Sequence, residues 1–484
     1  MITANHFDFA DTFPSEILQI LQAVSQASAQ INQQSFVIGG FVRDFYIKKG
    51  ANTKRTDLDF VTLGSGIAVA EKTAELLAIQ NISTFKRFGT AHIHWKGYDL
   101  EFVGARKESY SQDSRKPIVE NGTLEDDQNR RDFTINTLSW DLSYYPKAVL
   151  NDPFKGLEDI ERKILRTPLD PEITFSDDPL RMLRAVRFAC TLDFIIEENT
   201  FAGIKKMAPR LSIISAERIS DEINKIMMIP KPSKGFALLL KSELLQEFFP
   251  EMIELLGAEE VNGIGHKDNF WHTLQVLDNI SEVSTDLWLR WAALMHDIAK
   301  PPTKRFDEKV GWTFHGHEVL GAKWTPRIFR RLSLPLDERM KYVQKLVRLH
   351  LRPIALADEI VTDSAIRRLL FDAGDAIDDL MQLCRADITS KNQRKVIRYL
   401  ENFDRVEQKI IEVEEKDRIR NWQPPVKGED IMRELNLKPG PEVGIVKKTI
   451  EEAILNGEIP NEYEAAYQFM LSFKTHFGSV TENE

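Results

Sequence analysis

The spacing of apolar residues changes once along this chain, near residue 160, and this change most limits the folds that the chain can adopt. Before Asp159, segment 14–33 has the three-to-four-residue spacing of a helix, and short runs have the alternation typical of β-strands, at 35–38, 57–63, 92–95 and 98–103. After Asp159, helical spacing prevails. We therefore predict an α+β fold, with a head that contains a small mixed sheet with helices and a long all-α body behind it.

Proline-containing breaks divide the helical body at 230–232, 301–302 and 423–425. A chain of 484 residues is too long for one hydrophobic core, and three or four domains are expected. We predict a head over 1–160, a helical neck over 161–245, a third, helical domain over 246–400 and a helical tail over 401–484.

Composition excludes several classes of protein. Cys190 and Cys384 are too few for a disulfide framework or a cysteine zinc site. No run of about 18 apolar residues is present, which argues against a membrane span. Residues 1–13 lack the basic flank and apolar run of a secretory signal. These features are typical of a cytoplasmic enzyme.

The net charge of −10 argues against a nucleic-acid partner, but the distribution of the basic residues argues for one. One basic stretch contains Arg181, Arg184, Arg187, Lys205, Lys206 and Arg210. The other contains Lys323, Arg327, Arg330, Arg331, Arg339, Lys341, Lys345, Arg348 and Arg352. Each stretch fits either a phosphate-binding surface or a solvated helix face.

The segment Asp57-Leu58-Asp59 carries the main chemical signal of the head. In a strand, residues two apart point to the same face, so both carboxylates project together while Leu58 and Phe60 enter the core. Paired carboxylate oxygens suit Mg²⁺, which also takes ligands from substrate phosphates. Taken alone, an Asp-x-Asp pair is more often a solvated strand face than a metal site.

A glycine pair precedes these aspartates and strengthens the prediction. Gly39 and Gly40 follow a strand and begin a helical segment, where backbone N–H groups can approach a phosphate and the helix dipole favours its charge. Arg43, three residues later, could add a cationic fork to the same phosphates. The segment therefore predicts a phosphate-binding turn beside the two aspartates.

These residues belong to an ordered series of motifs that resembles the bacterial tRNA nucleotidyltransferase and poly(A) polymerase family, whose head has the polymerase-β-like nucleotidyltransferase fold. The series covers roughly the first 225 residues and comprises Gly39-Gly-Phe-Val-Arg-Asp44, Asp57-Leu-Asp59, Arg130-Arg-Asp-Phe-Thr-Ile-Asn136, Asp152-Pro-Phe-Lys-Gly156, Asp177-Asp-Pro-Leu-Arg181 and Glu217-Arg218. It departs from the family's usual pattern at Asp177, where Glu is common, and at Thr137, where Ala is common.

The resemblance implies addition of C, C and A to tRNA 3′ ends from CTP and ATP. Asp57 and Asp59 would be catalytic, holding two Mg²⁺ ions that lower the pKa of the RNA 3′-hydroxyl and screen the triphosphate. The nucleotide would be bound by Gly39, Gly40, Arg43, Arg106, Arg130, Arg131, Asp132, Asn136, Asp178, Arg181 and Arg184. For the Arg130–Asp132 segment, a surface salt-bridge cluster is the alternative. The helical tail resembles the tRNA-binding tail of the same enzymes.

Asp178 and Arg181 offer a physical reason for base choice. Three residues apart on a helix, they share a face. A carboxylate accepts from an exocyclic amino group and a guanidinium donates to a ring nitrogen, a pattern that C and A satisfy and that U and G leave unpaired. An N-capping Asp178 with an ion pair to Arg181 is the compatible structural alternative.

The body contains a second set of metal-ligand residue types. His296-Asp297 lies in an apolar helical run, where a buried imidazole and carboxylate are costly unless an ion or a hydrogen-bond network satisfies them. Such ligands suit Mn, Fe, Ni or Zn rather than Mg²⁺. The order of His272, His296, Asp297 and Asp387 resembles the HD-type phosphohydrolases, in which these four bind a metal and activate water against a phosphoester. His317 and His350 would complete a second metal position or bind phosphate.

Several alternatives stay open at this point. Within the class, a poly(A) polymerase or an enzyme that adds only CC or only A shares every motif. From other classes come an HD phosphohydrolase whose head senses nucleotide or RNA, and a non-catalytic RNA-binding scaffold. The HD-type domain could be an inactive scaffold, and the tail could form a dimer, so that a homo-oligomer is one further alternative.

Overall fold

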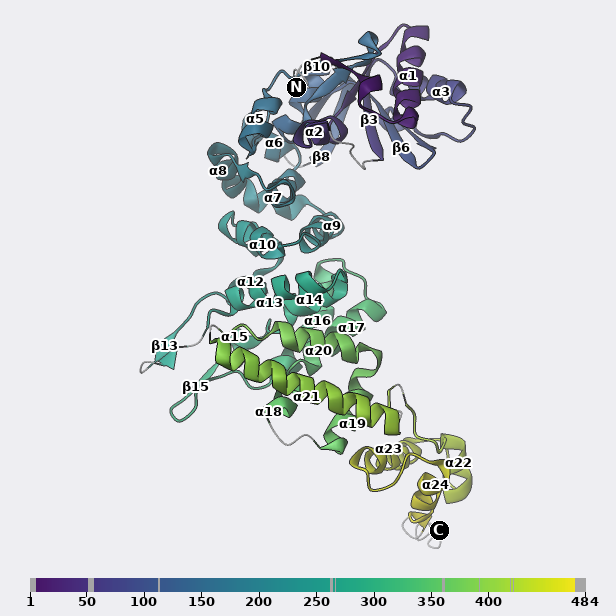
Figure 1. Cartoon of the computed structure of the whole chain (residues 1–484), viewed down its shortest axis with the longest axis vertical. Helices are drawn as coiled ribbons and strands as arrows, with labels where there is room; N and C mark the ends of the chain where they lie inside the picture. The colour runs from purple at the N-terminus through teal and green to yellow at the C-terminus, as the bar shows by residue number, and fades with distance from the viewer. Residues whose placement is uncertain are drawn as a thin grey trace. The chain divides into compact units, whose positions relative to one another are not determined.

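The computed structural model describes residues 6–50, 56–111, 114–261, 264–265, 267–358, 362–390, 392–417, 419–420 and 422–474. The chain divides into two compact units (Figure 1). The first unit comprises Met1–Ile226 and Lys234–Phe248, and the second comprises Met227–Ser233 and Phe249–Glu484. The finer division into four domains remains a prediction.

An eight-stranded mixed sheet forms the head, in the order β1-β10-β9-β2-β3-β6-β5-β4. β3 and β6 run parallel, and the other neighbouring strands run antiparallel. The strands are β1 (His6–Asp8), β2 (Gln34–Ile38), β3 (Asp57–Leu63), β4 (Ser83–Phe85), β5 (Thr90–Trp95), β6 (Tyr98–Gly104), β9 (Ser139–Asp141) and β10 (Lys147–Asn151). A separate hairpin joins β7 (Arg106–Ser111) to β8 (Ser114–Asn121).

Side-chain alternation in β3 and β6 positions the head's chemistry. Leu58, Phe60, Leu100 and Phe102 are buried on one face, and the rings of Phe60 and Phe102 stack 4.9 Å apart. On the other face, cross-strand pairing places Asp57 beside Asp99 and Asp59 beside Glu101, so the acids share a face that is less buried. The helices of the head are α1 (Ser15–Gln30), α2 (Gly40–Ile47), α3 (Gly66–Leu76), α4 (Leu124–Asn129) and α5 (Gly156–Arg162).

Helices continue the first unit after the sheet. They are α6 (Pro171–Asp177), α7 (Leu180–Leu192), α8 (Glu198–Met207), α9 (Ala216–Met227), α10 (Pro232–Lys241) and α11 (Leu245–Phe248). Helix α7 is amphipathic: Met182, Leu183, Ala185 and Val186 are buried, while Arg181 and Arg184 on its other side are not fully buried. The basic residues of α7 are therefore available to a neighbouring site.

The second unit is helical. Its helices are α12 (Pro250–Glu254), α13 (Asn269–Val283), α14 (Leu287–Met295), α15 (Lys300–Thr303), α16 (His317–Arg331), α17 (Glu338–Leu349), α18 (Leu351–Asp358), α19 (Asp363–Ala373), α20 (Ile377–Ala386), α21 (Gln393–Asp417), α22 (Gly428–Leu435), α23 (Pro441–Asn456) and α24 (Tyr463–Leu471). Every residue of α14 from Leu289 to Met295 is buried, as expected for the central helix of a bundle.

The predicted change from strand to helix near residue 160 is confirmed. Within the described part of the chain beyond that point, strands are two or three residues long: β11 (Ile164–Leu165), β12 (Ile195–Ile196), β13 (Glu260–Val261), β14 (Ile264–Gly265), β15 (Arg305–Asp307) and β16 (Gly311–Thr313). The predicted α+β class with an all-α body is therefore correct. Among the described residues, no helix combines the length and apolar character needed to cross a membrane.

Candidate active sites

Asp57 and Asp59 lie near the start of β3, as the alternation predicts. Asp57 is exposed and Asp59 is partly buried, whereas Leu58 and Phe60 between and beyond them are fully buried. The strand is held in the middle of the sheet by β2 and β6, so the two carboxylates stand on a rigid element. The two carboxylates lie on the same face of the strand, which is what a shared metal site requires.

Gly39 brings the chain close to these carboxylates. Its φ of +81° is in the region that favours glycine, and a Cβ added there would lie 3.3 Å from both Asp59 Oδ2 and Arg131 Nη1. Gly40 then begins helix α2. The predicted glycine turn therefore lies directly beside the aspartate pair, at the N-terminal end of a helix.

A chain of hydrogen bonds joins four of the predicted nucleotide-binding residues. Arg43 Nη1 donates to Asn136 Oδ1 at 2.8 Å, and Asn136 Nδ2 donates to Asp132 Oδ1 at 2.8 Å. Arg184 donates to the other Asp132 oxygen through Nε and Nη2, at 2.8 and 2.6 Å. Because Arg43 is buried and its guanidinium also binds Asp44, the structure places it behind Asn136 as a support.

The charge on Asp132 is fixed by this network. Burial would raise its pKa, but the nearby Arg184 guanidinium and the Asn136 amide outweigh burial and lower the pKa to about 2. In turn, Asp132 raises the pKa of Arg184. Both groups therefore stay ionised at neutral pH and hold α7 against the segment that contains Asp132.

Arg130 and Arg131 are aligned by a residue that sequence reasoning missed. Asp127, which is fully buried within α4, accepts from Arg130 Nε and from Arg131 Nε, each at 3.0 Å. The two arginines are therefore held by one carboxylate at its two oxygens, which orients them together. A salt-bridge cluster, the alternative considered for this segment, is therefore present with the Asp127 carboxylate at its centre. The cluster is only partly exposed.

Asp178 and Arg181 flank the start of α7. The Asp178 carboxylate accepts from the backbone N–H of Leu180 at 3.2 Å and from Arg218 Nη2 at 3.2 Å. Arg181 donates to the carbonyl oxygens of Arg130 at 2.5 Å and Thr174 at 3.2 Å. The capping role weighed as an alternative for Asp178 is thus present, while its ion-pair partner among the described residues is Arg218.

These side chains line one cavity of about 330 Å³, which we call the head cavity. Its lining comprises Asp59, Glu101, Val103, Arg106, Arg130, Arg131, Asp132, Asp178, Leu180, Arg181, Arg184 and Arg218. A predicted catalytic aspartate and the predicted base-reading pair therefore share one cavity with five further arginines. Asp57, Gly39, Gly40, Arg43 and Asn136 lie outside the lining, although Gly39 and Asn136 contact residues that belong to it.

Glu101 is a second site residue that the sequence reasoning missed. It is paired across β3 and β6 with Asp59, and burial together with the Asp59 charge raises its pKa. Arg218, which belongs to the last motif of the series, also lines the head cavity. Alternation in segment 98–103 could have placed Glu101 on the exposed face, but only the pairing of β3 with β6 places it beside Asp59.

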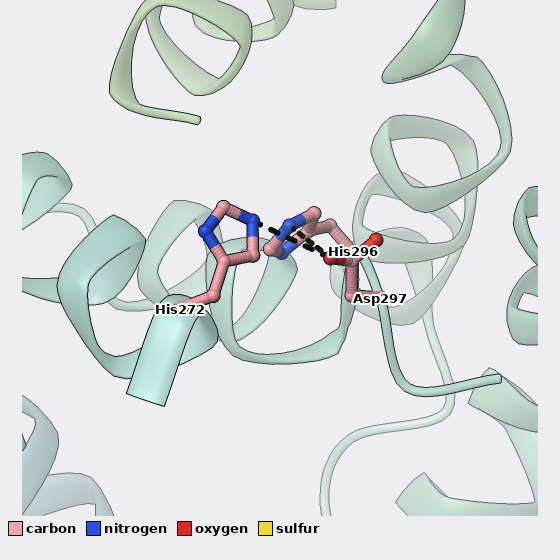
Figure 2. Close-up of side chains that lie close together, drawn as sticks. All are labelled: His272, His296 and Asp297. Atoms are coloured by element: carbon pink, nitrogen blue, oxygen red, sulfur yellow. Dashed lines mark ion pairs between the residues drawn. The ribbon is translucent and has the colours of Figure 1, made fainter. Parts of the chain in front are cut away.

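In the second unit, six predicted ligands converge from distant parts of the chain. We call His272, His296, Asp297, His317, His350 and Asp387 the body cluster. Figure 2 shows the first three, with His272 and His296 directed towards the Asp297 carboxylate. His272 Nε2 lies 3.5 Å and His296 Nε2 3.2 Å from Asp297 Oδ2. His272 Nε2 also lies 2.8 Å from Asp387 Oδ1.

The other oxygen of Asp297 faces a second pair of histidines. His317 Nε2 lies 3.2 Å and His350 Nε2 3.8 Å from Asp297 Oδ1. The body cluster therefore offers two sets of ligand atoms that could each hold an ion, one with His272 and His296 and one with His317 and His350, both including Asp297. This arrangement fits a centre with two metal positions bridged by one carboxylate.

The histidine tautomers favour metal binding. His296, His317 and His350 each place Nδ1 2.6–2.8 Å from the carbonyl oxygen three residues earlier, and His272 Nδ1 lies 2.8 Å from Thr389 Oγ1. Because a carbonyl can only accept, Nδ1 carries the proton in those three rings and Nε2 presents a lone pair to the cluster. His296 Nε2 is buried without a hydrogen-bond partner, as expected for an atom that binds a metal.

The carboxylates of the body cluster are ionised. Although burial would raise both pKa values, the imidazoles around them outweigh it, so the pKa of Asp297 falls well below its usual range and that of Asp387 falls to about 2. Burial lowers the pKa of His350 to about 3, which keeps that ring neutral. The neutral His350 imidazole and the ionised carboxylates are donors that transition metals accept.

The second basic stretch is largely ion-paired. Arg331 binds Glu251 at 2.8 Å, Arg339 binds Asp337 at 2.6 Å and Lys341 binds Glu338 at 2.6 Å. These pairs fit a solvated, ion-paired helix surface better than a bare phosphate-binding one. By contrast, Arg181 and Arg184 of the first stretch line the head cavity.

Four known protein families match successive parts of the chain. Residues 35–166 match the poly A polymerase head domain, and residues 193–256 match a probable RNA- and SrmB-binding site of polymerase A. Residues 269–392 match the HD domain, and residues 358–470 match a putative second domain of tRNA nucleotidyltransferases.

Relatives of known function cover most of the chain. An A-adding tRNA nucleotidyltransferase of Deinococcus radiodurans is 33% identical over 71% of this chain and 78% of its own length. A CC-adding tRNA nucleotidyltransferase of Thermus thermophilus is 30% identical over 90% of this chain and 92% of its own length. A CCA-adding enzyme of Streptococcus gordonii is 27% identical over 95% and 98%.

Solved structures show the same fold. An apo CCA-adding enzyme matches with a TM-score of 0.63 at 20% identity, covering 97% of this chain and 99% of its own. The Bacillus stearothermophilus CCA-adding enzyme in complex with CTP matches with a TM-score of 0.63 at 23% identity, covering 97% and 100%.

Proposed function

The chain belongs to the tRNA nucleotidyltransferase family, and on that premise we propose that it adds C, C and A in turn to tRNA 3′ ends, using CTP and ATP. One observation carries the proposal: Asp59 of the predicted metal-binding pair, a set of arginines and the Asp178–Arg181 pair line a single cavity. A triphosphate and a base can therefore be bound by the same cavity, beside the carboxylates that support the chemistry.

Different residues of the head cavity would bind the triphosphate and the metal ions. Arg106, Arg130 and Arg131 would bind the triphosphate, with the last two oriented by Asp127. Mg²⁺ held by Asp57 and Asp59 would supply activation of the 3′-hydroxyl and charge screening of the triphosphate. The new ester bond forms between the RNA 3′-oxygen and the α-phosphorus, while the bond to pyrophosphate breaks and the hydroxyl proton is released.

Base choice would rest on Asp178 and Arg181. Arg218 holds the Asp178 carboxylate, and two backbone carbonyls hold the Arg181 guanidinium, so both groups are oriented before a nucleotide binds. Each Asp178 oxygen already accepts one hydrogen bond, but a second lone pair can accept from N4 of C or N6 of A, and a remaining guanidinium N–H of Arg181 can donate to N3 or N1. U and G would leave these groups unpaired.

Single-nucleotide incorporation by the purified protein tests the proposal. Three tRNAs, ending before CCA, after C and after CC, are each offered one labelled nucleotide with Mg²⁺. We expect C on the first two, A on the third, and no addition of U or G. Long A tails on unrelated RNA would contradict the proposal and indicate a poly(A) polymerase.

Addition of A alone is the second candidate. The specific observation in its favour is the relative with 33% identity, which is an A-adding enzyme. The same assay separates the two, because an A-adding enzyme labels the CC-ended tRNA and leaves the other two unlabelled.

We also propose that the body cluster hydrolyses a phosphoester with a transition metal, Mn, Fe, Ni or Zn. The unpartnered Nε2 of His296 and the donor set around it support this proposal. Bound metal would supply activation of water, whose oxygen bonds to phosphorus as the ester P–O bond breaks and the proton passes to the leaving alcohol. Metal-dependent release of nitrophenol from p-nitrophenyl phosphate, lost in Asp297→Asn, tests it.

A further inference from the structure

The body cluster is accessible from one end. The side chains of His296, Asp297 and His350 are at most 2% exposed and that of His317 is 6% exposed, whereas His272 is 8% and Asp387 19% exposed. A cavity of about 180 Å³, which we call the side cavity, begins at Asp387. A molecule that reaches the cluster would therefore meet this cavity.

The lining of the side cavity is mostly apolar, with polar groups from a few residues. Apolar or aromatic side chains from α18, α20, α21 and the segment after α20 form the wall: Ile354, Cys384, Ile388, Tyr399 and Phe403. Lys267, Thr389 and Ser390 add polar groups next to Asp387. Such a cavity suits a ligand with a flat apolar part and an anionic part, since one ammonium and two hydroxyls face the latter.

The hydrogen bonds around the Thr389 hydroxyl indicate that it can donate to a ligand. Lys267 Nζ donates to Thr389 Oγ1 at 3.1 Å, and His272 Nδ1 lies 2.8 Å from the same oxygen. When His272 Nε2 binds a metal, Nδ1 carries the proton and donates, so Thr389 Oγ1 accepts twice. The hydroxyl proton of Thr389 is then available to a ligand oxygen beside Asp387.

Cys384 does not act as a nucleophile in this cavity. Burial raises the pKa of its thiol well above the usual value, and its Sγ donates to the carbonyl oxygen of His350 at 3.0 Å. The thiol therefore contributes to the apolar part of the lining, and the chemistry lies at the body cluster and the polar residues beside Asp387.

We propose that the side cavity binds the planar, apolar part of a phosphoester, with Tyr399 packing against that part and Thr389 donating to a phosphate oxygen. The substrate class is an aryl or nucleoside phosphoester, in preference to phosphoesters of small polar alcohols. This inference rests on the proposed phosphohydrolase function of the body cluster and adds its specificity. Tyr399 and Thr389 are the specificity-determining residues.

Binding of two phosphonates to the Mn²⁺-loaded full-length protein tests the proposal without turnover. Phenylphosphonate and methylphosphonate carry the same anionic group, and neither has an ester bond to hydrolyse. By calorimetry we expect phenylphosphonate to bind at least about tenfold more tightly, because aromatic packing of a planar ring contributes an effect of that order. Equal affinity of the two ligands would overturn the proposal.

Substitutions test which residues of the side cavity cause the preference for phenylphosphonate. Tyr399→Ala should abolish most of the tenfold difference, whereas Ile397→Ala, at an exposed position of the same helix outside the cavity, should retain it. Thr389→Val should weaken both ligands several-fold at unchanged metal content, and Thr389→Ser should restore them. A phenyl preference that survives Tyr399→Ala would also overturn the proposal.

The same samples separate this proposal from the hydrolase proposal. A phenyl preference that depends on Tyr399, in a protein that fails to hydrolyse p-nitrophenyl phosphate, would support the binding site and contradict the hydrolase. Hydrolysis that depends on Asp297 together with equal phosphonate binding would support the hydrolase and contradict the site.

Discussion

At the scale of single residues, we propose that the aspartate pair on β3 carries the chemistry of the head. Asp57 is exposed and Asp59 is only partly buried, so replacing either should cost little stability. We expect Asp57→Ala to lower incorporation at least about a thousandfold, since a lost metal ligand removes several kcal/mol of charge stabilisation. Filter binding of tRNA should remain nearly unchanged. Full activity in this variant would refute the metal assignment.

Arg181 is the residue that we expect to control the choice of base. Its guanidinium is held by the carbonyl oxygens of Arg130 and Thr174 and lines the head cavity. Arg181→Ala should reduce the preference for C and A over U and G about ten- to a hundredfold, because the donor that distinguishes the ring nitrogens is removed. Competition between labelled nucleotides measures this ratio. Arg184→Ala, which changes a neighbouring arginine of the same helix, is the comparison variant. Unchanged selectivity in Arg181→Ala would contradict the assignment of base reading to Arg181.

Some of these residues could be predicted from the sequence, and others could not. Alternation in β3 correctly placed Leu58 and Phe60 in the core. The parallel pairing that puts Glu101 beside Asp59 joins segments some forty residues apart, and no local pattern specifies it. Similarly, the burial of Arg43 behind Asn136 depends on how α2 packs, so the sequence showed only that a cation follows the glycines.

At the scale of elements, α7 is coupled to the segment that contains Asp132 by the ion pair between Arg184 and Asp132. The folded-state pKa of Asp132, about 2, is below its ordinary value of 3.8. A carboxyl with a depressed pKa contributes stability that is present above its unfolded pKa and is lost as pH falls through the folded pKa. The contribution should therefore disappear between about pH 4 and pH 2.

Comparison with Asp132→Asn tests this coupling. The wild type should melt at a higher temperature than the variant at pH 7, because its ion pair is intact. The difference in melting temperature should shrink progressively as pH falls from about 4 towards 2. A difference that stays constant over this range would show that the charge of Asp132 does not stabilise α7.

The helices of the second unit should be cross-linked by metal. His272 comes from α13, His296 and Asp297 follow α14, His317 begins α16, His350 follows α17 and Asp387 follows α20, so one centre would join five helical segments. Removing the metal with EDTA should lower the melting temperature of the full chain, and adding Mn²⁺ should restore it, since a ligand that binds only the folded state stabilises it. Mg²⁺ should restore it poorly. An unchanged melting temperature after verified metal removal would contradict this role.

Element types were predictable from apolar spacing, but element edges and the shortest strands were not. The predicted run at 57–63 is β3, and the predicted helix over 14–33 contains α1 (Ser15–Gln30). β1 and β9 have three residues each, too few for an alternating pattern to be recognised, and pairing with β10 and β2 defines them. In the body cluster, His296-Asp297 was predicted because such a pair in an apolar helical run is chemically costly, and the other members were predicted from the resemblance to HD-type phosphohydrolases.

At the scale of the whole molecule, two sites belong to two compact units. The head cavity is built within the first unit and the body cluster within the second. We expect Asp297→Ala to abolish metal-dependent phosphohydrolysis and to leave nucleotide addition unchanged. Parallel assays of both activities on one preparation, with a melting curve as control, measure this. Loss of both activities in a folded variant would contradict the independence of the two sites.

The proposed order of nucleotide addition is the central claim, and one measurement tests it most directly. The purified protein is incubated with CTP, ATP and a tRNA that ends before CCA, and the 3′ ends are sequenced over time. The account predicts products ending in C, then CC, then CCA, with no further growth. Products that never gain C, that incorporate U or G, or that continue into a run of A would contradict it.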